Sequence, residues 1–355
     1  MELITSYALQ EFKEKIQSIG LEPYRASQVM NWIYQRLETD FHKMTNLSKA
    51  HRDILSKSFR AHTLELADKV SASDSVKYLF RAEDGYFIET VLIFERDHLT
   101  LCLSSQIGCA INCRFCATAR DGLVRNLSTP EIIDQYLLVQ RDLSQRIRNV
   151  VFMGMGEPLA NYGAVRKAVE IMISPWGIDL SKRRVSISTS GLIAQIKCMA
   201  QDPLMKELNL AISINAPSQY LREYLMPISK TNPLEELIET LGRFPYPPDR
   251  RIMLEYVIIK DINDHEKDAH SLAQLVKPYR KKFKINLIPY NPDPSLPFER
   301  PDLQRVYAFQ DILRSYNLSV FVRLSKGIEV FGACGQLRSK RKYFLEAVHD
   351  PPNNI

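Results

Sequence analysis

Long apolar runs are missing from this sequence of 355 residues, and so are internal repeats and low-complexity segments. The N-terminal segment, MELITSYALQEFKEKIQSIG, carries acidic side chains and lacks the apolar stretch of a secretory signal peptide. No later stretch holds the roughly 20 apolar residues that a transmembrane helix needs. We therefore expect a cytoplasmic protein without a membrane partner.

Cysteine is also scarce, with six residues in the whole chain. In a reducing compartment, so few thiols are more typical of metal ligands or reactive groups than of a disulfide framework. The net charge of +6 is compatible with a polyanionic partner such as nucleic acid, although many moderately basic proteins have no such partner. The hydrophobic share of 45% is that of an ordinary globular protein and excludes a disordered or fibrous chain.

Apolar residues recur at helical spacing in the N-terminal part of the chain. Three stretches show this spacing: residues 8–19, 26–37 and 47–58. They predict a small helical domain over residues 1–60. This domain either covers the main domain or binds RNA, and the side chains of Tyr24, Arg25 and Arg52 keep the second option open.

Between residues 61 and 94 the pattern changes to short alternating segments such as SVKYLFRA and YFIETVLIF, separated by a turn at Asp84-Gly85. The following segment, LTLCLSS, continues the pattern. We interpret residues 61–94 as a β extension that leads into the main domain.

Short apolar runs alternate with helical stretches throughout the rest of the chain. The runs are NVVFMGM, RVSIST, LNLAISI, RIMLEYVII, KINLIPY and LSVFVRL. Such alternation is typical of parallel βα units, and six runs favour an α/β fold with a full or partial barrel over residues 95–340, followed by a tail at 341–355. In that architecture the carboxyl ends of the strands face the active site.

Three cysteines lie close together in GCAINCRFCATA, with C-x3-C-x2-C spacing: Cys109, Cys113 and Cys116. Three thiolates leave one iron of a 4Fe-4S cluster without a protein ligand, and this open iron can bind a chelating cofactor. A structural zinc ion would need a fourth, distant ligand, and three unrelated thiols are the remaining alternative. We therefore predict a 4Fe-4S cluster.

The aromatic Phe115 before the last of these cysteines completes the motif C-x3-C-x-aromatic-C, which resembles the signature of the radical S-adenosylmethionine (SAM) superfamily. The resemblance implies a (β/α)6 partial barrel, in agreement with the apolar runs. It also implies that SAM binds the open iron through its amino and carboxylate groups. An electron from a donor such as flavodoxin or ferredoxin then cleaves SAM to methionine and a 5'-deoxyadenosyl radical.

Further segments resemble one family within this superfamily, the RlmN/Cfr adenosine methylases, in an order and spacing that cover nearly the whole chain. The segments are YRASQVMNWIY, CLSSQIGCAINCRFCATA, FMGMGEPLAN, RRVSISTSG, INLIPYNP and ACGQL. The resemblance implies methylation of an RNA adenine with two SAM molecules per turnover. The implied partners are 23S rRNA at the peptidyl-transferase centre and tRNA just after the anticodon.

Several polar and small residues follow the predicted strands. Glycines there let the backbone approach a ligand closely, and Glu157 can accept hydrogen bonds from an ammonium group. Hydroxyl and amide groups at strand ends suit ribose and carboxylate recognition. The family resemblance assigns SAM binding to Gly156, Glu157, Ser188, Ser213, Ile214, Asn215 and Asn291.

The resemblance also assigns three catalytic residues. Cys334 is implied to carry a methyl group as S-methylcysteine and to form a crosslink with the adenine, which Cys102 releases by forming a disulfide with Cys334. Glu89 is implied to accept the proton from the ring carbon, and its place near the end of its strand would put it in a shared pocket with Cys102. Without the resemblance, the two thiols would be interpreted as inert buried groups and Glu89 as a solvent-facing strand residue. Cys198 has no implied role and is expected in a helix core.

The sequence departs from the family pattern at Asn215, where a histidine is usual, and at Phe331, where an acid is usual. The GEP proline and the segment YRASQVMNWIY favour the RlmN branch, which methylates carbon 2, over the Cfr branch, which methylates carbon 8. We expect a monomer. The alternatives are a radical-SAM enzyme that acts on a small molecule or peptide, and a non-enzymatic RNA-binding protein with structural zinc.

Overall fold

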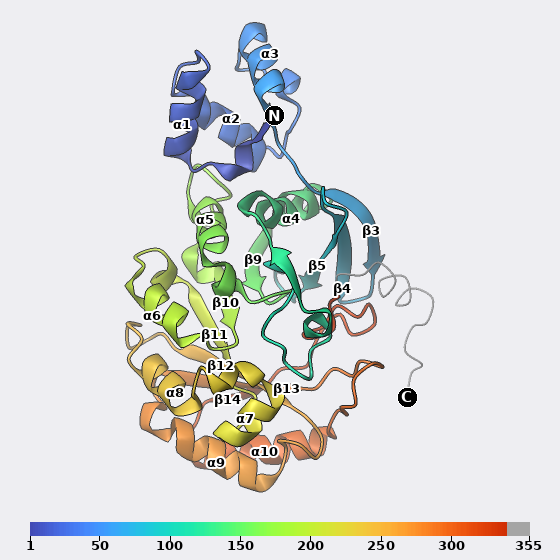
Figure 1. Cartoon of the computed structure of the whole chain (residues 1–355), viewed down its shortest axis with the longest axis vertical. Coiled ribbons are helices and arrows are strands. Elements are labelled where there is room, and N and C mark those ends of the chain that lie inside the picture. The colour runs from blue at the N-terminus through green and yellow to red at the C-terminus, as the bar shows by residue number, and fades with distance from the viewer. Residues whose placement is uncertain (339–355) are drawn as a thin grey trace.

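The computed structural model of the chain describes residues 1–338, and Figure 1 shows their arrangement. The tail predicted for residues 341–355 lies outside the described residues, as do the last two residues of the predicted main domain. The domain boundaries themselves stay a prediction.

Three helices form the N-terminal part of the chain and lie together at one end of the molecule (Figure 1). They are α1 (Leu9–Ser18), α2 (Arg25–Tyr34) and α3 (Lys49–Ser58), as the apolar spacing predicts. The Ser48 hydroxyl oxygen accepts a hydrogen bond from the backbone N–H of His51 and so begins α3. Glu11 of α1 pairs with Lys167 of α5 (Tyr162–Ile173) at 2.6 Å, which ties these helices to the rest of the chain.

One ten-stranded sheet runs through the remainder of the described chain, in the order β14-β13-β12-β11-β10-β9-β6-β5-β4-β3. Its strands are β3 (Glu65–Ser71), β4 (Ser75–Arg81), β5 (Phe87–Phe94), β6 (Leu99–Cys102), β9 (Ile147–Phe152), β10 (Val185–Thr189), β11 (Asn209–Ser213), β12 (Ile252–Ile258), β13 (Phe283–Pro289) and β14 (Val320–Val322). The six predicted apolar runs form the parallel strands β9 to β14, and β6 joins them in parallel. Strands β3 to β6 pair antiparallel, so the β extension is the edge of the same sheet.

Helices cover the outside of this sheet. They are α4 (Thr129–Arg141), α5, α6 (Ile193–Gln201), α7 (Gln219–Leu225), α8 (Leu234–Gly242), α9 (Glu266–Val276) and α10 (Leu303–Ser315). In Figure 1, α5, α6, α8, α9 and α10 follow one another around the curved sheet, as in a barrel. The predicted α/β partial barrel is therefore confirmed. Within residues 1–338, no helix is long and apolar enough to cross a membrane.

Strand β10 illustrates how the sequence directs side chains to the two faces of the sheet. Val185 and Ile187 are fully buried in the hydrophobic core, whereas Ser186 and Ser188 between them are only half-buried. Successive side chains of a strand point to opposite faces, so the serines face the inside of the barrel. This alternation brings Ser188 to the cavity described below.

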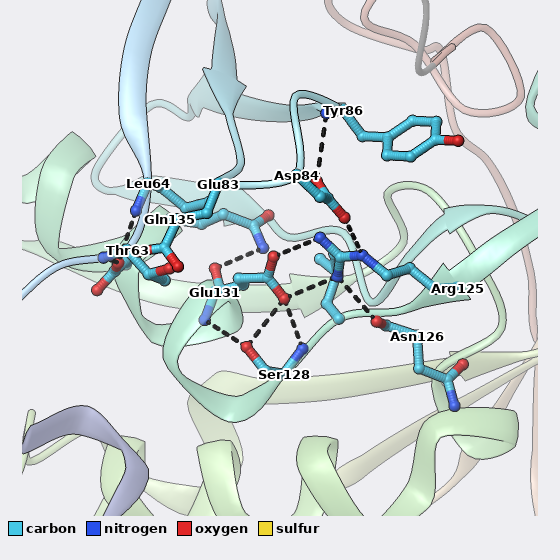
Figure 2. A network of polar contacts seen from close by, with 12 residues as sticks. Thr63, Leu64, Glu83, Asp84, Tyr86, Arg125, Asn126, Ser128, Glu131 and Gln135 are labelled. Carbon is cyan, nitrogen blue, oxygen red and sulfur yellow. Dashed lines mark hydrogen bonds and ion pairs between the residues drawn. The ribbon is translucent and has the colours of Figure 1, made fainter. Parts of the chain in front are cut away.

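A polar network fixes the hairpin that precedes and follows the cysteine loop (Figure 2). The hairpin consists of β7 (Gln106–Gly108) and β8 (Leu123–Asn126). Arg125 of β8 contacts the Glu131 carboxylate through two hydrogen bonds of 2.7 and 3.0 Å, and its Nε lies 2.5 Å from Asp84. Glu131 also accepts from the backbone N–H of Ser128 and completes a capping box at the start of α4.

A buried arginine joins the carboxyl ends of neighbouring strands. Arg222 of α7 donates to the carbonyl oxygens of Ser190, Ser213 and Ile214 at 2.6, 3.2 and 3.2 Å, and to the Ser229 hydroxyl at 2.7 Å. Burial lowers the pKa of this guanidinium to about 10, so it remains charged at neutral pH. The carbonyl groups that follow β10 and β11 therefore depend on this side chain for their hydrogen bonds.

We predict that Arg222→Met lowers the free energy of unfolding by roughly 3 kcal/mol or more, because it leaves several buried carbonyl groups without donors. Arg183→Met is the matched control, since Arg183 is 73% exposed and its contact with Asp249 is 3.9 Å long. It should change stability by less than about 0.5 kcal/mol. Thermal unfolding followed by circular dichroism compares the two variants, and equal midpoints would contradict the role of Arg222.

Candidate active site

The carboxyl ends of the parallel strands border one cavity, which we call the main cavity. Its lining brings together three cysteines and seven other predicted or flanking residues: Cys109, Cys113, Cys116, Gly156, Glu157, Ser188, Ser213, Asn215, Asn291 and Cys334. Ile214 is the exception among the predicted SAM contacts, because it is 1% exposed, belongs to the hydrophobic core and does not line the cavity. The carbonyl oxygen of Ile214 instead accepts a hydrogen bond from Arg222 Nε.

The three cysteines lie on one loop between β7 and β8. Asn112 adopts a left-handed backbone with φ of 58°, which bends this loop between Cys109 and Cys113. Phe115 is buried in a small apolar cluster with residues of α7 and so anchors the loop. The loop is thereby held against the wall of the main cavity.

The chemistry of these thiols fits an iron-sulfur cluster. Burial raises the pKa of Cys113 well above its ordinary value, and the neighbouring Cys109 and Cys116 add to the shift. Three adjacent thiolates therefore need a positive group between them. In a 4Fe-4S cluster each cysteine binds a different iron, so three thiolates leave one iron open to a chelating cofactor.

Gly156 and Glu157 form one wall of the main cavity. Gly156 has a φ of 96°, and a Cβ atom there would lie 2.4 Å from Cβ of Gln106, so no larger residue fits. Glu157 accepts hydrogen bonds from the backbone N–H groups of Ser190 at 2.7 Å and Leu159 at 3.0 Å. Burial raises the pKa of Glu157, and these hydrogen bonds oppose the shift. The carboxylate is therefore fixed in place and keeps lone pairs for a ligand.

Several buried polar atoms in the cavity wall have no hydrogen-bond partner within the protein. They are Ser190 Oγ, Glu255 Oε2, the Tyr290 hydroxyl and Asn291 Oδ1. Buried polar atoms are normally satisfied, so these atoms fit a ligand that carries both donors and acceptors, as SAM does. Sequence reasoning missed three of these four residues. For Glu255 a signal was present, namely one acid inside the apolar run RIMLEYVII.

Asn215, the first departure from the family pattern, has a structural explanation. Its φ is 57°, a left-handed conformation that asparagine tolerates better than most residues. Its Oδ1 accepts a hydrogen bond from the backbone N–H of Val257 at 2.8 Å, and its carbonyl oxygen accepts from Asn263 at 2.8 Å. The side chain therefore links the ends of β11 and β12 while it borders the main cavity.

Cys334 lies where the main cavity adjoins a second cavity. Cys102, at the end of β6, lines this second cavity together with Cys334 and Arg323. The two thiols are not bonded to each other, and Cys334 is accessible because it borders both cavities. Burial raises the pKa of Cys102 to about 12, whereas the Arg323 guanidinium opposes this shift. Cys334 therefore has access both to the cavity of the three loop cysteines and to the cavity of Cys102. The sequence did not point to Arg323 as a residue of this site.

The structure corrects the expected place of Glu89 on its strand and also excludes the alternative interpretation as a solvent-facing residue. It is the third residue of β5, near the beginning of the strand rather than its end, and it is 1% exposed rather than solvent-facing. It lines neither the main nor the second cavity. Its carboxylate contacts Lys77 Nζ at 3.2 Å and the backbone N–H of Arg338 at 2.7 Å. Burial raises the pKa of Glu89, and the charge of Lys77 opposes that shift.

The expectation for Cys198 was also wrong. The residue does lie on a helix, α6, but on its exposed face and not in the core. The buried positions of α6 are Ile193, Ile196 and Met199. Cys198 is not on the face of the helix that these residues share.

Two protein-family models match the chain. The Ribosomal RNA large subunit methyltransferase N-terminal domain matches residues 4–61, and the Radical SAM superfamily matches residues 103–273. The first match covers the helical N-terminal part, and the second covers the cysteine loop and most of the barrel strands.

Curated relatives are similar over nearly the whole chain. A probable dual-specificity RNA methyltransferase RlmN of Aquifex aeolicus is 64% identical over 96% of this chain and 98% of its own length. The dual-specificity RNA methyltransferase RlmN of Syntrophobacter fumaroxidans is 41% identical over 94% of this chain and 97% of its own. The crystal structure of a radical SAM methyltransferase from Sphaerobacter thermophilus has a TM-score of 0.91 and 37% identity, and the match covers 96% of this chain and 100% of that one. The chain therefore belongs to the RlmN family of radical SAM RNA methyltransferases.

Proposed function

We propose that this enzyme methylates carbon 2 of an adenine in 23S rRNA and in tRNA, and that Cys334 carries the methyl group. The observation that carries the proposal is the position of Cys334, which borders the cavity of the three loop cysteines on one side and the cavity of Cys102 on the other. The relatives named dual-specificity RNA methyltransferase support an RNA substrate.

The enzyme uses a 4Fe-4S cluster and SAM, the cofactors of its superfamily. Cys109, Cys113 and Cys116 would bind the cluster. The backbone at Gly156 would approach SAM, and polar side chains of the main cavity would hold its charged groups and ribose: Glu157, Ser188, Ser213, Asn215 and Asn291. When bound, the cluster and SAM supply a carbon radical that is reactive enough to act on an unactivated methyl group.

The chain's own residues then control the transfer. Cys334 first accepts a methyl group on sulfur. This carbon loses one hydrogen atom to the radical and then bonds to the adenine. Glu89 accepts the proton that leaves the ring carbon. The Cys102 thiolate attacks the sulfur of Cys334 and forms a disulfide, while the electron pair of the broken sulfur–carbon bond stays on the carbon, which takes up a proton and leaves as the methyl group of the base. Arg323 favours the thiolate forms of both cysteines, because its positive charge lies near them.

The helical N-terminal domain, taken as residues 1–60, is proposed to bind RNA. Tyr24 is 54% exposed, and the Arg25 guanidinium lies over its ring at 4.6 Å. Exposed aromatic rings and arginines are the side chains on which bases stack and phosphates bind. We also propose a β extension over residues 61–94 and a radical-SAM core over residues 95–340. We propose that the enzyme is a monomer and works in the cytoplasm. Its RNA substrates are found there, as is an electron donor such as flavodoxin or ferredoxin.

Protein purified without oxygen is expected to be brown and to contain about four irons and four acid-labile sulfides per chain. Cys113→Ala should lose most of the iron, because one ligand of the cluster is missing. Cys198→Ala serves as the control and should keep it, since this thiol lies on the exposed face of α6. A colourless wild-type protein with one zinc would contradict the cluster.

The two remaining functional thiols are predicted to fail at different steps. Cys334→Ala should transfer no methyl group from labelled SAM to RNA, because the acceptor sulfur is gone. Cys102→Ala should accumulate protein covalently attached to RNA, because the bond to Cys334 is not broken. Gel electrophoresis and scintillation counting separate these outcomes. An active Cys334→Ala enzyme would disprove the methyl carrier, and clean product release by Cys102→Ala would remove Cys102 from its role.

Substrate and ring position are tested together by mass spectrometry of nucleosides from rRNA and tRNA, with and without the gene, in a strain that has no second copy. We expect 2-methyladenosine to disappear from both RNAs when the gene is deleted. Loss of 8-methyladenosine instead would assign the other ring carbon. Unchanged levels of both nucleosides would indicate a substrate other than RNA.

A further inference from the structure

Lys77 and Glu89 form a buried ion pair between two neighbouring strands. Lys77 Nζ lies 3.2 Å from Glu89 Oε1, and the two side chains are 2% and 1% exposed. Lys77 of β4 pairs across the sheet with Val91 of β5, so Glu89 is its diagonal neighbour on the same face. Both charges are therefore fixed to the sheet and not to a loop.

This pair contacts the loop of Cys334 on both sides of the cysteine. Lys77 Nζ donates a hydrogen bond of 3.3 Å to the carbonyl oxygen of Phe331, which precedes Cys334. Glu89 Oε2 accepts a hydrogen bond of 2.7 Å from the backbone N–H of Arg338, which follows it. One charged pair thus spans the segment 331–338, which we call the Cys334 loop.

The Cys334 loop is held in a conformation that its sequence disfavours. Phe331 has a φ of 47°, in the left-handed region that bulky side chains rarely adopt. This is the residue whose carbonyl oxygen Lys77 binds, and it is the second departure from the family pattern. The hydrogen bond from Lys77 to this carbonyl oxygen therefore helps to hold the strained conformation.

Glu89 cannot reach RNA while these contacts persist. One carboxylate oxygen faces Lys77, the other accepts from Arg338, and the residue borders neither cavity. An adenine ring can approach it only after the Cys334 loop has moved. That movement takes away the carbonyl of Phe331 and the N–H of Arg338. It leaves Lys77 beside Glu89, because the two residues lie on paired strands.

We propose that Lys77 is a positioning residue: together with Glu89 it latches the Cys334 loop, and after the loop moves it keeps Glu89 ionised for proton transfer. The inference rests on the proposed function, in which Glu89 accepts the proton of the ring carbon. In that step the adenine C–H bond breaks, an O–H bond forms on Glu89, and the electron pair stays with the ring. A buried carboxylate without a counter-ion would already carry a proton and could not accept another.

The latch is tested by hydrogen–deuterium exchange of the holoenzyme, kept anaerobic and without RNA. Lys77→Met should speed exchange in the Cys334 loop several-fold. The loop loses its hydrogen bond from Lys77, and Glu89 without its counter-ion accepts a weaker hydrogen bond from the N–H of Arg338. Lys77→Met/Glu89→Gln, which buries no unpaired charge, should show the same fast exchange even if the single variant folds poorly. Lys197→Met is the control, since it removes a surface ion pair with Glu236, and its exchange in the loop should match the wild type.

Proton transfer is tested with SAM, reductant and RNA. Lys77→Met should still methylate Cys334 but accumulate protein attached to RNA, whereas Lys77→Arg, which keeps the charge, should restore product release. Loop exchange equal to wild type in both Lys77→Met and Lys77→Met/Glu89→Gln would overturn the latch. Normal product release by Lys77→Met without an adduct would overturn the positioning role. The exchange result does not depend on catalysis, so an active Cys334→Ala enzyme would defeat the proposed function and leave the latch standing.

Discussion

Parallel pairing of β6 with β9, and of β9 through β14 with one another, is the constraint on which the site depends. Strands that run in the same direction end at the same edge of a sheet, so residues distant in sequence meet there. Glu157 after β9, Ser188 on β10, Ser213 on β11 and Asn291 after β13 line one cavity for this reason. The alternation of side chains along each strand sends their polar groups inward and the apolar ones toward the helices.

Hydrogen-bond satisfaction separates the scaffold from the ligand site. Arg222 and Glu131 are satisfied within the protein, and they hold strand ends, the cysteine hairpin and the start of α4 in place. Glu255 and Asn291 each keep a buried oxygen without a partner at the wall of the main cavity. Unpaired buried polar atoms are destabilising, so the oxygens of Glu255 and Asn291 fit a role in binding a ligand, whereas Arg222 and Glu131 serve the scaffold.

The Cys334 loop joins parts of the chain that are far apart in sequence. It contacts the β extension through Lys77 and Glu89. On its other side the Thr118 hydroxyl donates to the carbonyl oxygen of Leu337 at 2.6 Å, next to the cysteine loop. The β extension is therefore more than the edge of the sheet. It supplies the charged pair that contacts the Cys334 loop at Phe331 and Arg338, while the barrel supplies the main cavity that Cys334 borders.

The sequence by itself determined the helical N-terminal part, the strands, the grouping of the three loop cysteines and the family. Hydrophobic periodicity and motif spacing are properties of residues that are close together in the chain. It could not determine the burial of Glu89, since the residue that covers it, Arg338, is 249 positions away. The exposure of Cys198, the withdrawal of Ile214 into the core and the unpaired oxygen of Glu255 depend likewise on which segments pack together. Only the tertiary structure decided these points, because burial and hydrogen bonding are set by contacts between distant parts of the chain.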